Sequence, residues 1–174
     1  CINMIPAGIY QTCSPEEVAY IINHSEAPIV LVENEAQWAK VNEVRGDLPN
    51  LKRIVTMRGA SIDDADTLTW DEFLALGDEV DPTDVDARVK GLNPSDPATF
   101  IYTSGTTGPP KAVMLSHDNL AWTADTAVSI VDQTHLDTSL SYLPLSHIAE
   151  QMFTLHAPIT SGASVYFAEG IEQM

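Results

Sequence analysis

One short segment combines the groups that proteins use to hold phosphate. Ten consecutive residues contain four serine and threonine hydroxyls, two glycines and a lysine: Tyr102-Thr103-Ser104-Gly105-Thr106-Thr107-Gly108-Pro109-Pro110-Lys111. Glycine permits a positive φ and a close approach of the backbone, so that amide N–H groups can converge on phosphate oxygens. Hydroxyls add donors, and the Lys111 ammonium adds a mobile positive charge. The segment therefore predicts a phosphate-binding loop.

This loop is not a Walker A motif, which reads G-x-x-x-x-G-K-[ST] and passes from a strand directly into a helix. Counted from Gly105, Pro110 stands where the second glycine belongs, and Ala112 where the magnesium-binding hydroxyl belongs. The residues after Lys111 form a short apolar run, and a helix signal appears only at Ser116 or His117. We therefore expect a different kind of phosphate loop.

Two motifs carry a resemblance to a known family. With the Ala-Val-Met-Leu-Ser-His that follows it, the loop resembles the signature of the adenylate-forming (AMP-binding) superfamily. A second stretch resembles the next core motif of the long-chain fatty acyl-CoA synthetases (ligases): Tyr142-Leu143-Pro144-Leu145-Ser146-His147-Ile148-Ala149-Glu150-Gln151. Residues 8–27 are similar to the segment before the loop in the same enzymes. The resemblance implies an α/β fold with a parallel-rich sheet flanked by helices, as an internal fragment of the large N-terminal domain.

The resemblance also implies roles for residues of both motifs. The pyrophosphate end of ATP is expected to be held by Thr103, Ser104, Gly105, Thr106, Thr107, Gly108 and Lys111. Thr103 is expected to join Mg²⁺ coordination, together with a glutamate that lies outside this chain. Lys111 and His147 are the expected catalytic side chains, and His147 would line the cleft where the carboxylate meets the α-phosphate or gate the acyl tunnel.

The implied activity is the ATP-dependent ligation of a long-chain fatty acid to CoA. The carboxylate attacks the α-phosphate to give acyl-adenylate and pyrophosphate, and CoA then takes the acyl group and releases AMP. The expected cofactors and small-molecule partners are ATP, Mg²⁺, CoA and a fatty acid, and the fragment alone is expected to be inactive. Two alternatives stay open, namely adenylation of an amino acid or other carboxylate and a non-catalytic nucleotide-binding module.

Ala112 departs from the family pattern, which usually has glycine after the lysine. If this position requires a positive φ, alanine costs about 1 kcal/mol or more. The substitution is then either a tolerated variant or a sign of weakened nucleotide binding.

The charge of the chain excludes one class of partner. Eight Lys and Arg against 25 Asp and Glu give a net charge of −17, which repels nucleic acid and anionic surfaces. Much of the acidic excess lies at 63–66 and 78–86, where we expect a solvated face.

Cys1 and Cys13 are too few for a disulfide framework and lack metal-ligand spacing, which fits a reducing cytoplasm. Apolar runs are too short to span a bilayer, and peripheral membrane contact stays open.

Local signals predict alternating helices and strands. Ser14, Asn34 and Thr69 are expected to cap helices, with Glu17 and Glu72 completing two capping boxes. Strands are expected over 29–32, 53–57, 98–102 and 164–168, and a further helix from Ser116 or His117 to Val131. The order of helices and strands implies a parallel sheet covered by helices.

We expect the chain to be part of one domain, with an acidic connection before the phosphate loop. The acidic stretch 78–97 is expected to be a linker or surface connection. Residues 1–92 and 93–174 are expected to be two parts of one truncated AMP-binding domain, the second of which carries the phosphate loop.

Several side chains have an ordinary structural explanation. Glu150 is expected at an exposed helix start, where a carboxylate suits the helix dipole without any function. Trp122 is expected to be a core or half-exposed aromatic rather than a border of an acyl tunnel. The remaining histidines show no spacing that favours a metal site: His24, His117, His135 and His156.

Overall fold

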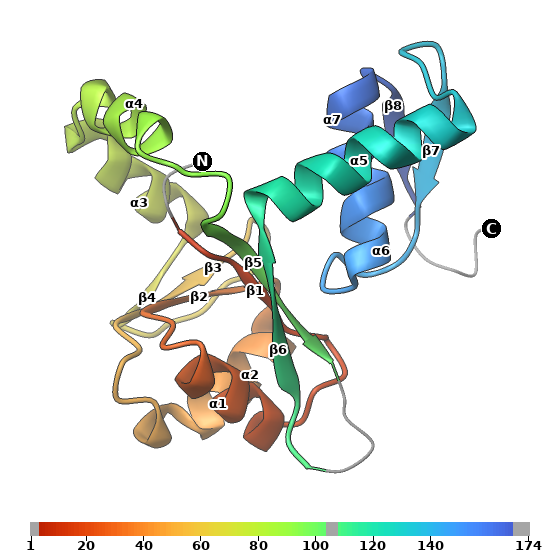
Figure 1. The fold of residues 1–174 in the computed structure, drawn as a ribbon. Helices are drawn as coiled ribbons and strands as arrows, with labels where there is room; N and C mark the ends of the chain where they lie inside the picture. The colour runs from red at the N-terminus through yellow and green to blue at the C-terminus, as the bar shows by residue number, and fades with distance from the viewer. Residues whose placement is uncertain (1–3, 104–107, 169–174) are drawn as a thin grey trace. The chain divides into compact units, whose positions relative to one another are not determined.

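The chain divides into two compact units (Figure 1). A computed structural model describes residues 4–103 and 108–168. One unit, called here the N-terminal unit, runs from Ile9 to Arg88. The other, called the loop-bearing unit, combines the first eight residues with Val89–Met174. The first residues belong to the second unit because their strand pairs with a strand that comes much later in the sequence.

The N-terminal unit alternates helices with parallel strands. Its elements are α1 (Pro15–His24), β2 (Ile29–Val32), α2 (Glu35–Glu43), the 3₁₀-helix η1 (Arg45–Asp47), β3 (Arg53–Thr56), β4 (Thr67–Leu68), α3 (Trp70–Ala75), the 3₁₀-helix η2 (Leu76–Glu79) and α4 (Pro82–Lys90). The strands pair in the order β2-β3-β4, and both pairings are parallel. This confirms the expectation of a parallel sheet from the order of the elements.

The three predicted N-caps of this unit are confirmed. The Ser14 hydroxyl accepts from the Glu17 backbone N–H, and the Glu17 carboxylate accepts from the Ser14 N–H. Thr69 and Glu72 form the same reciprocal pair at α3, and Asn34 caps α2. Because these contacts join residues three positions apart, the local sequence is sufficient to specify them.

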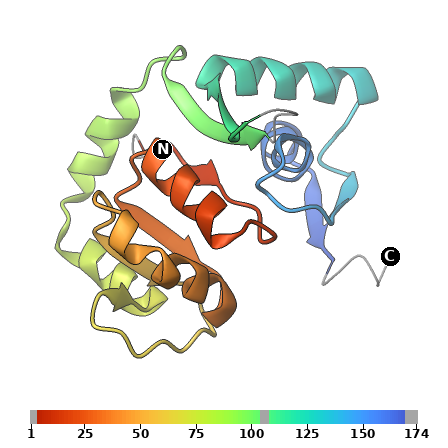
Figure 2. The same ribbon diagram turned by 90° about the horizontal axis from the view of Figure 1, so that it is seen from below.

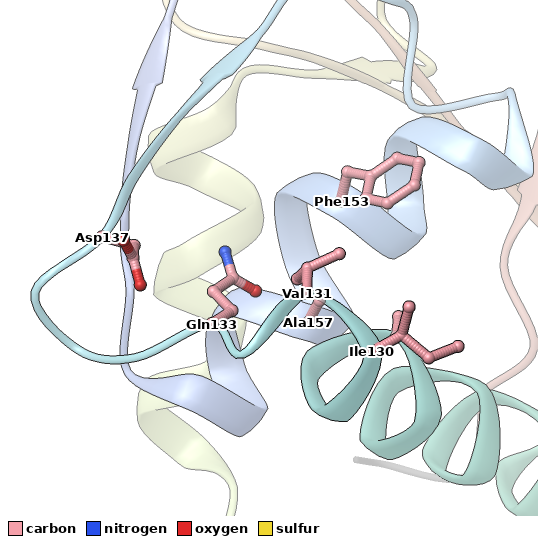
Figure 3. Close-up of a pocket in the computed structure, with 7 residues that line it drawn as sticks. Ile130, Val131, Gln133, Asp137, Phe153 and Ala157 are labelled. Atoms are coloured by element: carbon pink, nitrogen blue, oxygen red, sulfur yellow. The ribbon is translucent and has the colours of Figure 1, made fainter.

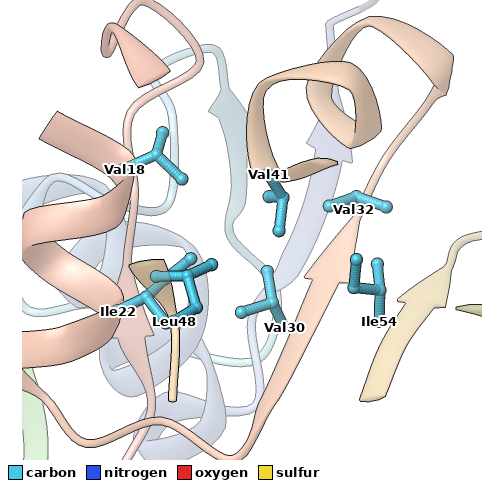
Figure 4. Close-up of a cluster of buried hydrophobic side chains, with 7 residues drawn as sticks. All are labelled: Val18, Ile22, Val30, Val32, Val41, Leu48 and Ile54. Atoms are coloured by element: carbon cyan, nitrogen blue, oxygen red, sulfur yellow. The ribbon is translucent and has the colours of Figure 1, made fainter. Parts of the chain in front are cut away.

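One buried apolar cluster forms the core of the N-terminal unit (Figure 4). It gathers side chains of α1, α2, β2, β3 and the segment before β3: Val18, Ile22, Val30, Val32, Val41, Leu48 and Ile54. Ile54 is 0% exposed and Ile22 is 1% exposed. Full burial of a side chain of this size stabilises the fold by about 1.5–3 kcal/mol, so this cluster is the main source of stability of the unit.

The stretch 78–97 lies at the surface, as expected, but it is not a simple linker because much of it is helical. Pro82–Lys90 form α4, which begins with proline at a position where the missing N–H costs no helical hydrogen bond. Asp81 accepts hydrogen bonds from the backbone N–H and the hydroxyl of Thr83. No residue of α4 is buried: Val85 and Val89, which lie four positions apart as on one face of a helix, are 40% and 44% exposed.

The loop-bearing unit contains two further sheets. Its elements are β1 (Ala7–Gly8), β5 (Pro97–Thr103), β6 (Lys111–Ser116), α5 (His117–Val131), β7 (Thr138–Ser141), α6 (Ile148–Gln151), the π-helix η3 (Met152–His156), α7 (Ala157–Ser161) and β8 (Ser164–Phe167). Strand β5 pairs parallel with β1 and antiparallel with β6, whereas β7 and β8 pair parallel. The α/β class is therefore confirmed, and the pairing of the described strands is mostly parallel.

Helix α5 is held by a small buried cluster. Leu120 and Ala124 pack with Met152 of η3, and Ala98, Leu115 and Ile148 border them. Helices α6, η3 and α7 follow one another as a single run, which Figure 2 views along its axis. Helix α5 begins at His117, as expected, and Ser116 is its N-cap. Across the described ranges, no helix combines the length and the apolar content that crossing a membrane requires.

Candidate nucleotide site

The predicted phosphate loop connects two antiparallel strands. Thr103, the last residue of β5, lies opposite Lys111, the first residue of β6, and its hydroxyl donates to the Lys111 carbonyl oxygen at 3.5 Å. Between them, Ser104, Gly105, Thr106 and Thr107 lie outside the described residues. The chain therefore leaves the loop through a strand, whereas a Walker A loop leads directly into a helix.

Gly108 meets the conformational requirement for which glycine is suited. Its φ is +98°, in the region that side chains with a Cβ rarely adopt. A Cβ added there would meet no atom of the described residues within 4 Å, and the need for glycine comes from the backbone angle. The residue is exposed, as a loop that receives a ligand from solvent requires.

Lys111 is placed to attract an anion. Its side chain is exposed, and none of the residues described by the structure forms an ion pair with it. It is also the only Lys or Arg in residues 91–174. Among the Lys and Arg side chains, its ammonium therefore supplies the positive charge of residues 91–174, in a chain with a net charge of −17.

A metal ion would need ligands beyond those that the structure describes. No group of three or more His, Cys, Asp or Glu side chains that could hold one occurs in the described part of the chain. Thr103 is exposed at the first end of the loop. This position suits its hydroxyl as one ligand of Mg²⁺, with a phosphate oxygen as another.

Ala112 causes no backbone strain. It lies in β6 opposite Tyr102, and the only non-glycine residues with positive φ in the described ranges are Glu26 and Asp132. The position does not need the conformation that would penalise alanine. The substitution is therefore tolerated by the backbone.

The second motif lies against β1, the strand that pairs with the one leading into the loop. Ser146 is packed so closely on Gly8 that a Cβ added to Gly8 would lie 2.8 Å from the Ser146 Cα. Gly8 pairs with Ile101 in β5, which ends shortly afterwards at Thr103. The sequence pointed to Gly8 only through the family resemblance, and its spacing did not predict the contact with Ser146. The fold thus brings the two motifs to the same part of the loop-bearing unit.

His147 forms the junction between the motif and α6. Its Nδ1 accepts a hydrogen bond from the Ala149 backbone N–H at 3.2 Å, which makes it the N-cap of the helix. Because Nδ1 accepts, the neutral imidazole carries its proton on Nε2. The exposed side chain can therefore offer an N–H donor to a bound carboxylate or phosphate.

The expectation that Glu150 is exposed was wrong. Its side chain is only 4% exposed, and its Oε1 accepts from the Ser141 hydroxyl at 2.5 Å, the Thr154 hydroxyl at 2.7 Å and the Tyr142 N–H at 3.1 Å. Burial raises the pKa of the carboxyl, but these hydrogen bonds outweigh burial, so the pKa is lowered and the group is ionised. Three of its partners, Ser141, Tyr142 and Leu143, precede the helix and could not be identified from helical spacing.

A hollow elsewhere in the loop-bearing unit contains none of the predicted site residues (Figure 3). It has a volume of about 530 Å³ and lies between the end of α5 and the run of η3 and α7. Its lining is mostly apolar: Ala127, Ile130, Val131, Gln133, Asp137, Phe153 and Ala157. Trp122 does not line it, and with 68% of its surface exposed this side chain is not in the core.

Comparison with known proteins agrees with both motifs. Residues 2–174 match the family model described as AMP-binding enzyme. The chain belongs to the AMP-binding enzyme family. Among curated relatives of this AMP-binding chain, the long-chain-fatty-acid–CoA ligase ACSBG2 of Xenopus laevis is 42% identical over 167 residues, and ACSBG2 of Homo sapiens is 41% identical over 164. Each match covers 93% of this chain but only 23% and 25% of the relative.

Solved structures show the same fold for this AMP-binding chain. A putative long-chain-fatty-acid CoA ligase from Rhodopseudomonas palustris superimposes with a TM-score of 0.78 at 18% identity, covering 98% of this chain and 39% of that one. The anthranilate CoA ligase AuaEII, in complex with anthranoyl-AMP, gives a TM-score of 0.75 at 24% identity, covering 94% and 30%. These likenesses show that the described region has a fold found in part of these CoA ligases.

Proposed function

We propose that the protein containing this chain activates a long-chain fatty acid with ATP, forming an acyl-adenylate, and then transfers the acyl group to CoA. The observation that supports this most directly is the β5–β6 hairpin. It places the Thr103 hydroxyl and the Lys111 ammonium on opposite sides of a glycine-containing loop. The two relatives above are named long-chain-fatty-acid–CoA ligases, which favours a fatty acid as the carboxylate.

The hairpin loop would hold the triphosphate of ATP. Loop N–H and hydroxyl groups from Thr103 to Gly108 would donate to β- and γ-phosphate oxygens, and Lys111 would neutralise charge on the departing pyrophosphate. Thr103 would also be one ligand of Mg²⁺, which supplies further neutralisation of the phosphates. This role of the protein is positioning and electrostatic, because the carboxylate of the substrate is itself the nucleophile.

His147 would act on the other side of the reacting atoms. Its Nε2–H can donate to the carboxylate or to an α-phosphate oxygen, which would align the two for attack. The contact of Ser146 with Gly8 supports this placement because Gly8 adjoins the strand that leads into the loop. Residues 1–92 and 93–174 would belong to one AMP-binding domain, and CoA would be bound largely by parts of the protein beyond this chain.

We also propose a cytoplasmic protein whose partners are small molecules. The support for the location is the small number of cysteines, and the support against nucleic acid is the net charge of −17. Contact with a membrane surface would be peripheral and would deliver the fatty acid.

Pyrophosphate exchange into ATP tests the proposal directly. The complete protein is incubated with ATP, Mg²⁺ and labelled pyrophosphate, together with a long-chain fatty acid, an aryl carboxylate or a set of amino acids. We expect exchange that depends on the fatty acid, followed by acyl-CoA formation when CoA is added. Exchange that depends only on amino acids would show that an amino acid, and not a fatty acid, is the substrate. ATP binding without any exchange would indicate a non-catalytic nucleotide-binding module.

A further inference from the structure

The second motif contains a buried carboxylate. Glu150 is the only buried Asp or Glu in the described part of the chain, and no cation there is paired with it. An ionised group in such a place is costly unless hydrogen bonds replace its water. A side chain serving only to fill space would be apolar at lower cost, so the charge itself calls for an explanation.

The carboxylate joins the beginning of the Tyr142–His147 turn to the helical run that follows it. Its Oε1 receives the Ser141 hydroxyl and the Tyr142 N–H from one side, and the Thr154 hydroxyl of η3 from the other. Hydrogen bonds to an ionised acceptor are shorter and stronger than neutral ones. The start of the turn is therefore fixed to η3 by a single oxygen atom.

The end of the same turn is fixed by neighbouring contacts. The His147 carbonyl accepts from the Glu150 N–H at 3.0 Å, and the Gln151 side chain donates to the Leu145 carbonyl at 2.7 Å. Ser146 rests on Gly8. Contacts therefore hold the start of the turn, its end and Ser146. They give His147 a defined position, and Glu150 contributes to that position through the turn.

We propose that Glu150 is a positioning residue that fixes the Tyr142–His147 turn and thereby aligns the His147 side chain for the adenylation step. The inference rests on the proposed function. Within the described residues, the hydrogen-bond partners of the Glu150 carboxylate do not include Thr103 or Lys111, so the effect is expected in the chemical step and not in the affinity for ATP.

The test uses the complete protein and two substitutions, one at the Glu150 acceptor and one at a hydroxyl that donates to it. Glu150→Gln keeps the size of the side chain and removes its charge, and Thr154→Val removes one donor and keeps the shape. We expect Glu150→Gln to lower kcat of fatty-acid-dependent pyrophosphate exchange about tenfold, equal to about 1.4 kcal/mol in the barrier, with KM for ATP within about twofold of wild type. Thr154→Val is expected to lower kcat about threefold.

Each substitution is then combined with His147→Ala to separate positioning from general damage. If Glu150 acts through His147, Glu150→Gln adds less than about twofold to the loss that His147→Ala already causes. If the losses multiply in full, or if both single variants keep the wild-type kcat, the inference is overturned. Melting temperatures are measured alongside, and should Glu150→Gln not fold, Thr154→Val alone decides by the same criteria.

Thr160→Val is the matched control. Thr160 lies in the same helical run, is exposed, and donates to the His156 carbonyl at 3.0 Å instead of to Glu150. This control should keep the wild-type kcat, and a loss as large as that of Thr154→Val would contradict the inference. A wild-type protein that shows no exchange overturns the proposed function and the inference with it, whereas an active protein insensitive to Glu150→Gln and Thr154→Val overturns the inference only.

Discussion

The two units differ in where their apolar side chains lie. In the N-terminal unit, Ile54 and Val55 are completely buried between helices and a parallel sheet. In the loop-bearing unit, large apolar side chains such as Ile130 and Ile159 are 77% and 80% exposed, and its buried cluster is small. The predicted site residues all lie in the loop-bearing unit. Stability and chemistry are thus concentrated in different parts of the chain, and substitutions should separate them.

The largest effect is expected from opening the core of the N-terminal unit. Ile54→Ala removes a completely buried side chain and should lower the free energy of unfolding of the complete protein by about 4 kcal/mol. Urea denaturation measures the change, and pyrophosphate exchange per folded molecule should stay at the wild-type level. As a control, Leu31→Ala at a 52% exposed position of β2 should cost less than about 1 kcal/mol. Equal losses in the two variants would contradict the assignment of the core.

The reverse separation is expected at the loop. Lys111→Ala should lower the rate of pyrophosphate exchange about 100-fold, or about 2.7 kcal/mol, because a charge that stabilises the departing pyrophosphate is lost. The urea midpoint should not change, since the side chain is exposed. Lys52→Ala, an exposed lysine of the N-terminal unit, should leave both quantities unchanged. An active Lys111→Ala enzyme would remove Lys111 from the site.

A third substitution tests the contact that brings the two motifs together. Gly8→Ala places a Cβ 2.8 Å from the Ser146 Cα, so the turn or β1 must move, at a cost of about 2 kcal/mol. We expect a lower urea midpoint together with slower exchange, because the displaced turn carries His147. Gly46→Ala is the control, since a Cβ there meets nothing within 4 Å. If Gly8→Ala behaves like Gly46→Ala, the close packing of Gly8 on Ser146 is wrong.

The smallest effect concerns an ion pair in the N-terminal unit. The hydrogen bond from Arg45 at 3.0 Å, followed by that from the Thr67 hydroxyl at 2.6 Å, lowers the pKa of Asp64 below its ordinary value of 3.8. The stabilisation is therefore complete above pH 3.8 and is lost as the pH falls through the lowered pKa. Because both side chains are partly exposed, it should amount to only about 0.2–1 kcal/mol.

The pH dependence of the urea midpoint measures this contribution. The difference in midpoint between wild type and Asp64→Asn should be constant at neutral pH and should shrink in acid. A difference that persists unchanged well below the ordinary pKa of an aspartate would show that the ion pair contributes nothing that depends on charge.

Local signals were reliable where the physical cause was local. The capping residues Ser14, Asn34 and Thr69 were found from their spacing because each accepts from a backbone N–H three positions later. Helix α4 was missed because its apolar signal is short: Val85 and Val89 lie four positions apart in an otherwise mostly polar, acidic stretch. The Thr103–Lys111 segment was identified by residue types alone, but nothing in its sequence stated that it joins antiparallel strands.

By itself, the amino-acid sequence determined the kind of chemistry and the local elements: a hydroxyl-rich, glycine-containing loop with one lysine, capped helices, and a family membership carried by two motifs. The tertiary structure decided what depends on residues that are distant in the sequence. Pairing with Tyr102 places Ala112 in extended backbone, and contacts with Ser141, Tyr142 and Thr154 bury Glu150. Backbone angles in a strand and the burial of a carboxylate are set by partners from elsewhere in the chain, and no local pattern specifies those partners.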